Sequence, residues 1–444
     1  MLKKAQVYIV RGIEWLKDLP NDKWKLSVLS AIPFWAGAVL VGLISVFYAQ
    51  IFHWAEDAYL FLLEKFGLWM FLISPLFFVL SWYSVRRFAP LASGSGIPQV
   101  VASLEIIQSK RSHLISHFLG LPVLIVKIIS SAFLTLGGGV IGREGPTIQI
   151  SASIFKWMYD VLPAWWPRIS PKNMIMTGAA AGLAAAFNTP LGGLVFAIEE
   201  LTKSHISNFK NSIFIGVVIA GITAQSFLGS YLYLGYPIVT SINYSMIGLV
   251  LLSSMLIGGL AGIYTKLSIK LGNWKWSLNR FKTILYLILV SLFITAMSLF
   301  LDHRIAGTGR DIILSTLFGS EKYVEWFQPL GKFLGSLFSF TTGASGGVFA
   351  PSLSIGASFS AYFSSILELN SDNTNLLIMT GMVAFLTGIT RSPFTSAILV
   401  LEMTDRHNLI FFFMLAALMG NIASRRIHRK SLYDSIRENL LNRL

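Results

Sequence analysis

The sequence predicts an all-α polytopic membrane protein made of two inverted-topology repeats, in which helices are tilted and several are broken. Three observations lead to this fold class. Hydrophobic residues make up 54% of the 444 positions and charged residues only 13%, a balance more apolar than that of soluble globular domains. Apolar stretches long enough to cross about 30 Å of hydrocarbon recur along the chain. The two halves of the chain also resemble each other, as many transporters do.

The apolar stretches are the first element of the prediction. Examples are residues 26–51, 66–85, 246–264 and 284–301. Basic residues gather outside them: residues 1–25 carry six Lys or Arg against three acids, and residues 425–444 carry six against two. Because cytoplasmic flanks of membrane spans are rich in Lys and Arg, we expect both termini to be cytoplasmic and the number of crossings to be even.

Composition also limits the class of partner. A net charge of +14 is compatible with nucleic acid binding, but the positive charge lies at the two ends of the chain and no basic cleft with interleaved aromatics is recognised. We therefore expect lipid as the surrounding partner and no nucleic acid. The chain has no cysteine, which excludes disulfides and Cys-ligated metals. No cofactor or metal ion is expected.

An internal repeat is the second element of the prediction. Residues 178–200 align without gaps to residues 381–403, and residues 142–153 align to residues 347–358. If each half crosses the membrane an odd number of times, the halves have opposite orientations. We expect a single membrane domain over 1–444, with repeat halves at 26–225 and 240–424 and a basic cytoplasmic tail at 425–444. The aligned pairs include Gly178 with Gly381, Pro190 with Pro393, and Glu199 with Glu402.

Three glycine-rich breaks are the third element. They read GSGIP at 94–98, GREGP at 142–146 and GGVFAP at 346–351, and each places a proline where a helix begins. Irregular backbone at membrane depth survives only where it is buried in protein or lines a watery cavity. Helix N-termini that converge there would attract an anion through their amides and dipoles, without a fixed cation that would hold it too tightly.

These strings, in this order and spacing, resemble the CLC family of chloride channels and chloride/proton antiporters. The resemblance continues through residues 178–200, through EMTD at 402–405 and through KSLY at 430–433. It implies a CLC-like fold, a homodimer, and transport of chloride with other small anions permeating. It also implies a location in the bacterial inner membrane, since the tail resembles that of members without a C-terminal regulatory domain.

The resemblance also assigns the site residues. The Ser95 hydroxyl, the Tyr433 phenol and the backbone amides of Val348 and Phe349 would bind a central chloride. Glu144, within the second break, would be the gating glutamate, which blocks the pathway when ionised and swings away when protonated. A carboxylate and a chloride then compete for the same donors, which links anion occupancy to proton uptake.

Glu200 matches the internal proton-transfer glutamate of the antiporter branch, so exchange is favoured over passive flow. Its neighbour Glu199 corresponds by repeat to Glu402, and both are expected to be structural. Lys127 lies in an apolar run without an obvious acidic neighbour, and Glu105 is a candidate partner.

Two alternatives remain open at this point. The first is a passive, gated chloride channel of the same fold. The second is an intramembrane serine protease, because the residues around Ser345 read GASGG. A serine nucleophile needs a base, and the histidines after it, His407 and His428, lie beside a polar turn and in the basic tail. The sequence therefore favours an ion transporter, not an enzyme, with no catalytic residue.

Overall fold

A computed structural model describes residues 23–202, 211–229, 232–240, 244–319 and 322–443. Within these ranges the chain forms helices and no β-strand; the extended pairing consists of two isolated bridges. The predicted all-α class is confirmed. Seven apolar helical segments are long enough to cross a membrane.

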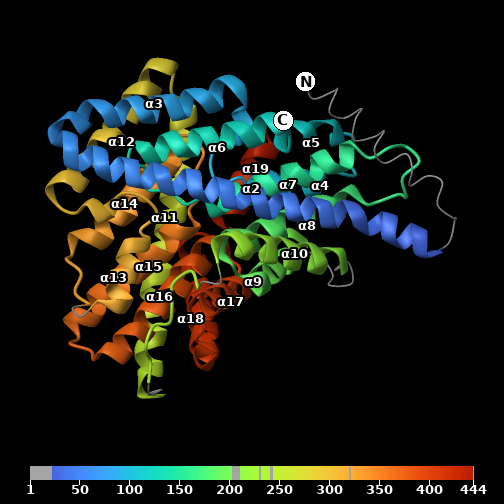
Figure 1. Ribbon diagram of the computed structural model, residues 1–444. Coiled ribbons are helices and arrows are strands. Elements are labelled where there is room, and N and C mark those ends of the chain that lie inside the picture. The colour runs from blue at the N-terminus through green and yellow to red at the C-terminus, as the bar shows by residue number, and fades with distance from the viewer. Residues whose placement is uncertain (1–22, 203–210, 230–231, 241–243, 320–321, 444) are drawn as a thin grey trace.

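The first half of the chain contains nine of the α-helices described, which Figure 1 colours from blue to green. They are α2 (Lys23–Phe66), α3 (Met70–Phe88), α4 (Ile97–Ile106), α5 (Ile115–Phe118), α6 (Leu121–Leu136), α7 (Glu144–Asp160), α8 (Pro171–Phe187), α9 (Pro190–Phe196) and α10 (Asn211–Leu228). A π-helical turn, Ala197–Thr202, continues α9.

The second half follows the same plan. Its helices are α11 (Ile247–Trp276), α12 (Arg280–Phe300), α13 (Arg310–Phe318), α14 (Phe327–Thr341), α15 (Phe349–Ile366), α16 (Ser371–Thr390), α17 (Pro393–Thr404), α18 (Ile410–Ile427) and α19 (Leu432–Leu441). Short 3₁₀ turns join some of them, including Gly67–Trp69 between α2 and α3.

The spans differ in length and tilt. At 1.5 Å per residue, the 44 residues of α2 extend over about 66 Å, twice the hydrocarbon thickness, so this helix must tilt strongly. The expected span at 66–85 is α3, which begins at Met70 because Gly67, at φ +49°, turns the chain after α2.

Burial separates an inner layer from a lipid-facing layer. The apolar helices α8 and α16 are buried along almost their whole length, and they pack against α7 and α15 respectively. Other helices expose large apolar side chains, as a lipid-facing surface requires. Examples are Phe47, Leu72, Phe281 and Phe411.

The aligned segments of the two halves have the same local structure. Asn188 directly follows α8 and Arg391 directly follows α16, both in the left-handed conformation, at φ 56° and 66°. Two residues later a proline opens α9 in one half and α17 in the other. The sequence repeat is thus also a repeat of helix, left-handed cap and proline-started helix.

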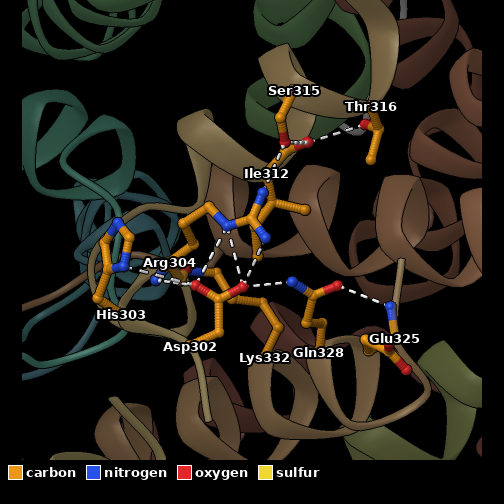
Figure 2. Close-up of polar contacts among 9 residues, drawn as sticks. All are labelled: Asp302, His303, Arg304, Ile312, Ser315, Thr316, Glu325, Gln328 and Lys332. Carbon is orange, nitrogen blue, oxygen red and sulfur yellow. Dashed lines mark hydrogen bonds and ion pairs between the residues drawn. The ribbon is translucent and has the colours of Figure 1, made fainter. Parts of the chain in front are cut away.

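A polar cluster folds the loop between α12 and α13 (Figure 2). The Asp302 carboxylate accepts hydrogen bonds from the backbone N–H of Arg304 at 2.8 Å, from its Nε at 2.9 Å, and from Gln328 Nε2. Burial raises the pKa of Asp302, but the hydrogen bonds from Arg304 and Gln328 outweigh it and hold the pKa below its usual value. Asp302 is therefore a stable anion that fixes Arg304 and the start of α14.

Candidate anion and proton site

The three glycine-rich breaks meet in the middle of the molecule through backbone hydrogen bonds. The Gly94 N–H donates to Ala344 O at 2.8 Å, and the Gly346 N–H donates to Gly94 O at 3.1 Å. Gly142 and Gly347 exchange N–H···O bonds in both directions, each 2.8 Å long. Segments more than 200 positions apart in the sequence are thereby joined into one assembly of irregular backbone.

Three helices start at this assembly. Helix α4 begins at Ile97, α7 at Glu144 and α15 at Phe349, one or two residues before the proline of each break. The sequence predicted each start at the proline itself. The earlier starts cost nothing because the first N–H groups of a helix have no intrahelical partner, so a proline within the first turn loses no hydrogen bond.

Helix α19 brings a fourth element to the same place. The basic tail folds back so that Tyr433, at its start, is 2% exposed and its ring stacks on Phe349 at 6.2 Å between centroids. Ser95 is also 2% exposed. In the described part of the chain, the Ser95 and Tyr433 hydroxyls have at most each other as a hydrogen-bond partner.

The donor set fits an anion. Val348 and Phe349 are 1% exposed and supply the first turn of α15, while Ser95 and Tyr433 supply hydroxyl groups. All of these donors are neutral, and a buried hydroxyl without a partner is costly. The geometry therefore brings together the four residues that the sequence predicts for a central anion.

Glu144 is fully buried at the first residue of α7. Its Oε2 lies directly over Gly142, where any side chain would collide with it, and a Cβ there would lie 3.2 Å from Ala350 Cβ at the start of α15. The carboxylate thus sits among helix N-termini, where the dipoles favour negative charge. This is the position in which it would compete with an anion.

Tyr233 is a contact that the sequence did not predict. It lies in an irregular stretch between α10 and α11, is 5% exposed, and its hydroxyl donates to Glu144 Oε1 at 3.4 Å. Its ring packs edge-on against Phe187 at 5.2 Å, and Arg310 donates to its carbonyl oxygen at 3.4 Å. No motif signals such a residue, because a loop and a helix 89 positions away create the contact.

The expected pairing of Lys127 with Glu105 is wrong. Lys127 is fully buried, and its Nζ donates to Ala92 O at 2.9 Å and Gly94 O at 2.8 Å. Glu105 instead pairs at 3.4 Å with Arg437 of α19. Lys127 needs no acidic partner because backbone carbonyl oxygens accept hydrogen bonds from its ammonium group. These bonds also fix the conformation of the glycine-rich break that contains Ser95.

Lys332 of α14 repeats this arrangement in the second half of the chain. Its buried Nζ donates to Ile305 O at 3.0 Å, Ala306 O at 2.8 Å and Gly307 O at 2.9 Å. The segment that it braces contains Gly307 and Gly309, both with positive φ, as Gly94 and Gly96 have in the first half.

The two adjacent glutamates of the π-helical turn point to different surroundings. Glu200 is 4% exposed, and its Oε2 accepts a hydrogen bond from Ser392 Oγ at 3.0 Å. Glu199 accepts from the backbone N–H of Thr395 at 2.8 Å, at the start of α17. A π-helical turn contains one residue more than an α-helical turn. Within this turn, Glu199 contacts the start of α17 and Glu200 contacts Ser392.

Glu402 mirrors Glu199. At the end of α17, it accepts from the backbone N–H groups of Leu191 at 3.0 Å and Gly192 at 2.7 Å, which open α9. Each helix of this pair therefore ends in a carboxylate that caps the start of the other. The geometry agrees with a structural role for both residues.

Among the residues that the structure describes, no base lies beside Ser345. Its hydroxyl donates to Ala92 O at 2.5 Å, and its N–H donates to Ser130 Oγ at 3.0 Å. His407 pairs with Asp405 at 3.3 Å, and the His428 ring contacts Lys430 O at 2.9 Å. Ser345 holds the backbone assembly together and has none of the geometry of a nucleophile.

Comparison with known proteins now adds the family. A family profile described as "Voltage gated chloride channel" matches residues 77–425. The chain belongs to this chloride channel family. Its curated relatives include the H(+)/Cl(−) exchange transporter ClcA of Klebsiella pneumoniae subsp. pneumoniae, 28% identical over 98% of this chain and 93% of the relative. The protein of the same name from Salmonella agona is 28% identical over 94% of this chain and 89% of the relative.

Solved structures agree with the family assignment. A slow cyanobacterial Cl⁻/H⁺ antiporter has a TM-score of 0.80 and 25% identity, covering 93% of this chain and 98% of the other. A CLC-type fluoride/proton antiporter has a TM-score of 0.76 at 19% identity, covering 94% of this chain and 99% of the other, and supports the fold alone. The family member described here is therefore an integral multi-pass membrane protein with the CLC fold.

Proposed function

We propose that this protein exchanges chloride, and similar small anions, for protons across a membrane. The observation that carries the proposal is the placement of Glu144, a buried carboxylate at the first residue of α7. It stands among the helix N-termini that also carry the neutral donors Ser95, Phe349 and Tyr433. The names of the ClcA relatives and of the cyanobacterial structure support the same exchange.

Competition for these donors couples the two ions. While Glu144 is ionised, its carboxylate occupies the positive ends of the helices and repels an entering anion. Protonation removes this charge, so the side chain can leave and a chloride can take its place. Because one negative charge replaces the other, anion entry favours proton uptake by Glu144, and anion exit favours its release.

A second carboxylate is needed for protons to reach Glu144 from the opposite side. We assign this role to Glu200, which is buried and accepts a hydrogen bond from the Ser392 hydroxyl. An ionisable group is expensive within a membrane, which argues for a functional role. A passive channel, the alternative within the fold, would have no use for it.

Flux in proteoliposomes tests the proposal. We expect that an imposed chloride gradient drives protons uphill in vesicles that contain the purified protein. In Glu144→Gln, a neutral side chain replaces the gate, so chloride leaks without proton movement and without dependence on pH. In Glu200→Gln, chloride movement continues and proton transport is lost.

Two outcomes would contradict the assignment. Chloride flux in the wild type with no proton pumping would establish a passive channel. A Glu200→Gln protein that still pumps protons would show that the internal relay lies elsewhere. Ser345→Ala tests the protease alternative, since it removes the only atom that could act as the nucleophile there, whereas chloride flux should persist.

We further propose that the protein is a homodimer with one pathway in each subunit, in the bacterial inner membrane, with both termini cytoplasmic. The lipid-facing apolar surface and the basic flanks of the first and last spans support this arrangement. Among anions, chloride is the preferred substrate, and other halides and nitrate also permeate, because neutral hydroxyl and amide donors discriminate weakly by chemistry.

A further inference from the structure

Helix α19 packs against α4, and each of these helices carries one side of the candidate anion site. Ser95 lies two residues before the start of α4, and Tyr433 is the second residue of α19. The placement of the Tyr433 hydroxyl relative to Ser95 therefore depends on how α19 is seated on α4.

The burial of α19 decreases along its length. Residues 431–433 and 435 are buried, whereas residues 436–443 are partly or fully exposed. Toward its end, α19 contacts α11 through polar side chains: Asn439 Nδ2 and Arg443 Nη2 each donate to Asn273 Oδ1 at 3.3 Å. Apolar packing is thus concentrated at the start of α19, and polar contacts contribute more toward its end.

An ion pair joins the middle of α19 to α4. Arg437 Nε lies 3.4 Å from Glu105 Oε2, and the two side chains are 18% and 54% exposed. Arg437 follows Tyr433 by four residues, so both side chains lie on the same face of α19. Glu105 lies in the last turn of α4. The two helices therefore meet near Ser95 at one end of α4 and through this ion pair at the other.

The position of Glu105 is unfavourable for α4 alone. A carboxylate in the last turn of a helix is repelled by the negative end of the helix dipole, and α4 has no basic residue in its last turn to offset this. Arg437 supplies the positive charge from the neighbouring helix. Glu105 thus contributes to the placement of α19 more than to the stability of α4.

The guanidinium of Arg437 is also held by carboxylates of its own helix. Its Nη1 lies 3.3 Å from Asp434 Oδ1, and its Nη2 lies 3.9 Å from Glu438 Oε1. The Asp434 carboxylate in turn accepts a hydrogen bond of 2.9 Å from the Ser431 hydroxyl. Because these contacts already restrict the Arg437 side chain, pairing with Glu105 costs less side-chain entropy than an isolated surface pair does.

We infer that Arg437 is a positioning residue for the anion site: its pairing with Glu105 sets the register of α19 on α4 and so holds the Tyr433 hydroxyl beside Ser95. The inference rests on the proposed function, because it concerns the binding of the transported anion. A partly exposed ion pair contributes modestly. The pair therefore tunes the affinity for chloride and is not needed for the chain to fold.

Two single substitutions that remove opposite charges test this role. If the two residues acted on chloride through their charges alone, Arg437→Gln would weaken chloride binding and Glu105→Gln would strengthen it. For a positioning pair, we expect both substitutions to raise the dissociation constant of chloride, by about threefold. The double variant should bind no more weakly than either single variant, because each substitution breaks the same contact. Isothermal titration of the purified protein with chloride measures these constants.

The matched control is Lys110→Gln, in the loop after α4. Lys110 is exposed and is not part of the ion pair between α4 and α19. Its substitution removes the same charge as Arg437→Gln and should leave the dissociation constant unchanged. The melting temperatures of both pair variants should stay close to that of the wild type, which separates positioning from a loss of folded protein.

Screening by salt provides a test without a substitution. The Debye length falls to about 3 Å at 1 M salt, which is comparable to the separation within the pair. Raising the ionic strength with the salt of a large organic anion should weaken chloride binding by the wild type and change it much less in the double variant.

Three results would overturn the inference: unchanged chloride binding by Glu105→Gln, tighter binding by that variant, or equal salt dependence of the wild type and the double variant. Exchange by the wild type in proteoliposomes, measured in parallel, tests the proposed function separately. If the wild type exchanges chloride for protons and the pair variants bind chloride as the wild type does, the positioning role is wrong and the proposed function stands.

Discussion

At the scale of single residues, the chemistry of this protein depends on what each carboxylate touches. Glu144, Glu199, Glu200 and Glu402 all lie near helix ends, yet two of them cap backbone N–H groups and two face hydroxyl groups. A cap needs a permanent charge in one place. A gate needs a charge that can leave, and the 3.4 Å contact of Glu144 with the Tyr233 hydroxyl is longer than the backbone hydrogen bonds of 3.0 and 2.7 Å that hold Glu402.

Tyr233 gives a prediction at this scale. Replacing it with Phe keeps the ring against Phe187 and removes the only hydroxyl that the described structure places on Glu144 Oε1. Since that hydrogen bond favours the ionised, blocking form, its loss should let chloride flux persist to higher pH. We expect the midpoint of the pH–flux curve to rise by about one unit, as measured in proteoliposomes.

Two controls separate this effect from a general disturbance. Tyr286→Phe removes a hydroxyl that contacts Thr341 at 2.7 Å and should leave the midpoint unchanged. Combining Tyr233→Phe with Glu144→Gln should add nothing to Glu144→Gln alone; a further shift there would place the effect of Tyr233 elsewhere. The other charged or phenolic groups around Glu144 stay in place in both variants: Tyr48, Glu56, Arg143 and Tyr433.

At the scale of elements, the crossed contacts between α9 and α17 are the notable feature. Glu199 follows α9 and caps α17, while Glu402 ends α17 and caps α9. A negative side chain at a helix N-terminus satisfies orphan N–H groups and complements the helix dipole. The two short helices therefore stabilise each other at both ends.

These caps give a prediction on stability. Glu402→Ala should destabilise the protein by about 1–2 kcal/mol, because the N–H groups of Leu191 and Gly192 lose their acceptor. Thermal unfolding in detergent measures the change, with the exposed Glu64→Ala of α2 as control. Glu199→Ala should have a similar effect; a wild-type melting temperature for both variants would show that the caps contribute nothing.

Much of this architecture could be predicted from the sequence because its signals are local. Proline after a glycine-rich break predicted the starts of α4, α7 and α15 to within two residues, and the repeat predicted that Glu199 and Glu402 are alike. The contact of Tyr233 with Glu144 and the carbonyl acceptors of Lys127 could not be predicted. Both sets of contacts depend on where segments distant in the sequence meet. Glu105 was the wrong candidate partner for Lys127 because backbone carbonyl oxygens accept the hydrogen bonds of its ammonium group in place of a carboxylate.

At the scale of the whole molecule, helix directions fix which segments share a side of the membrane. Helix α11 ends beside α19, as the hydrogen bond from Asn439 Nδ2 to Asn273 Oδ1 at 3.3 Å shows. Helix α12 then returns, so the loop from Asp302 to the start of α14 lies on the opposite side from α19. In Figure 1, α13 lies at the left of the molecule, well away from α19.

This arrangement predicts opposite labelling of two surface positions. The chain has no cysteine, so single cysteines can be introduced without background. If both termini are cytoplasmic, Tyr323→Cys should react with a membrane-impermeant maleimide in intact cells. Arg429→Cys should react only after the membrane has been permeabilised. Both side chains are exposed. The reverse pattern would invert the proposed orientation.

The crossed caps also bear on how such a chain arises. In an antiparallel pair of identical half-length chains, one glutamate would meet the start of the partner's short helix, and two-fold symmetry would create the second contact without any further mutation. Joining the two copies end to end preserves both contacts. The exchange between α9 and α17 is thus the pair of contacts that a duplication followed by fusion would be expected to leave, with an interface between two half-length subunits becoming the interior of one chain.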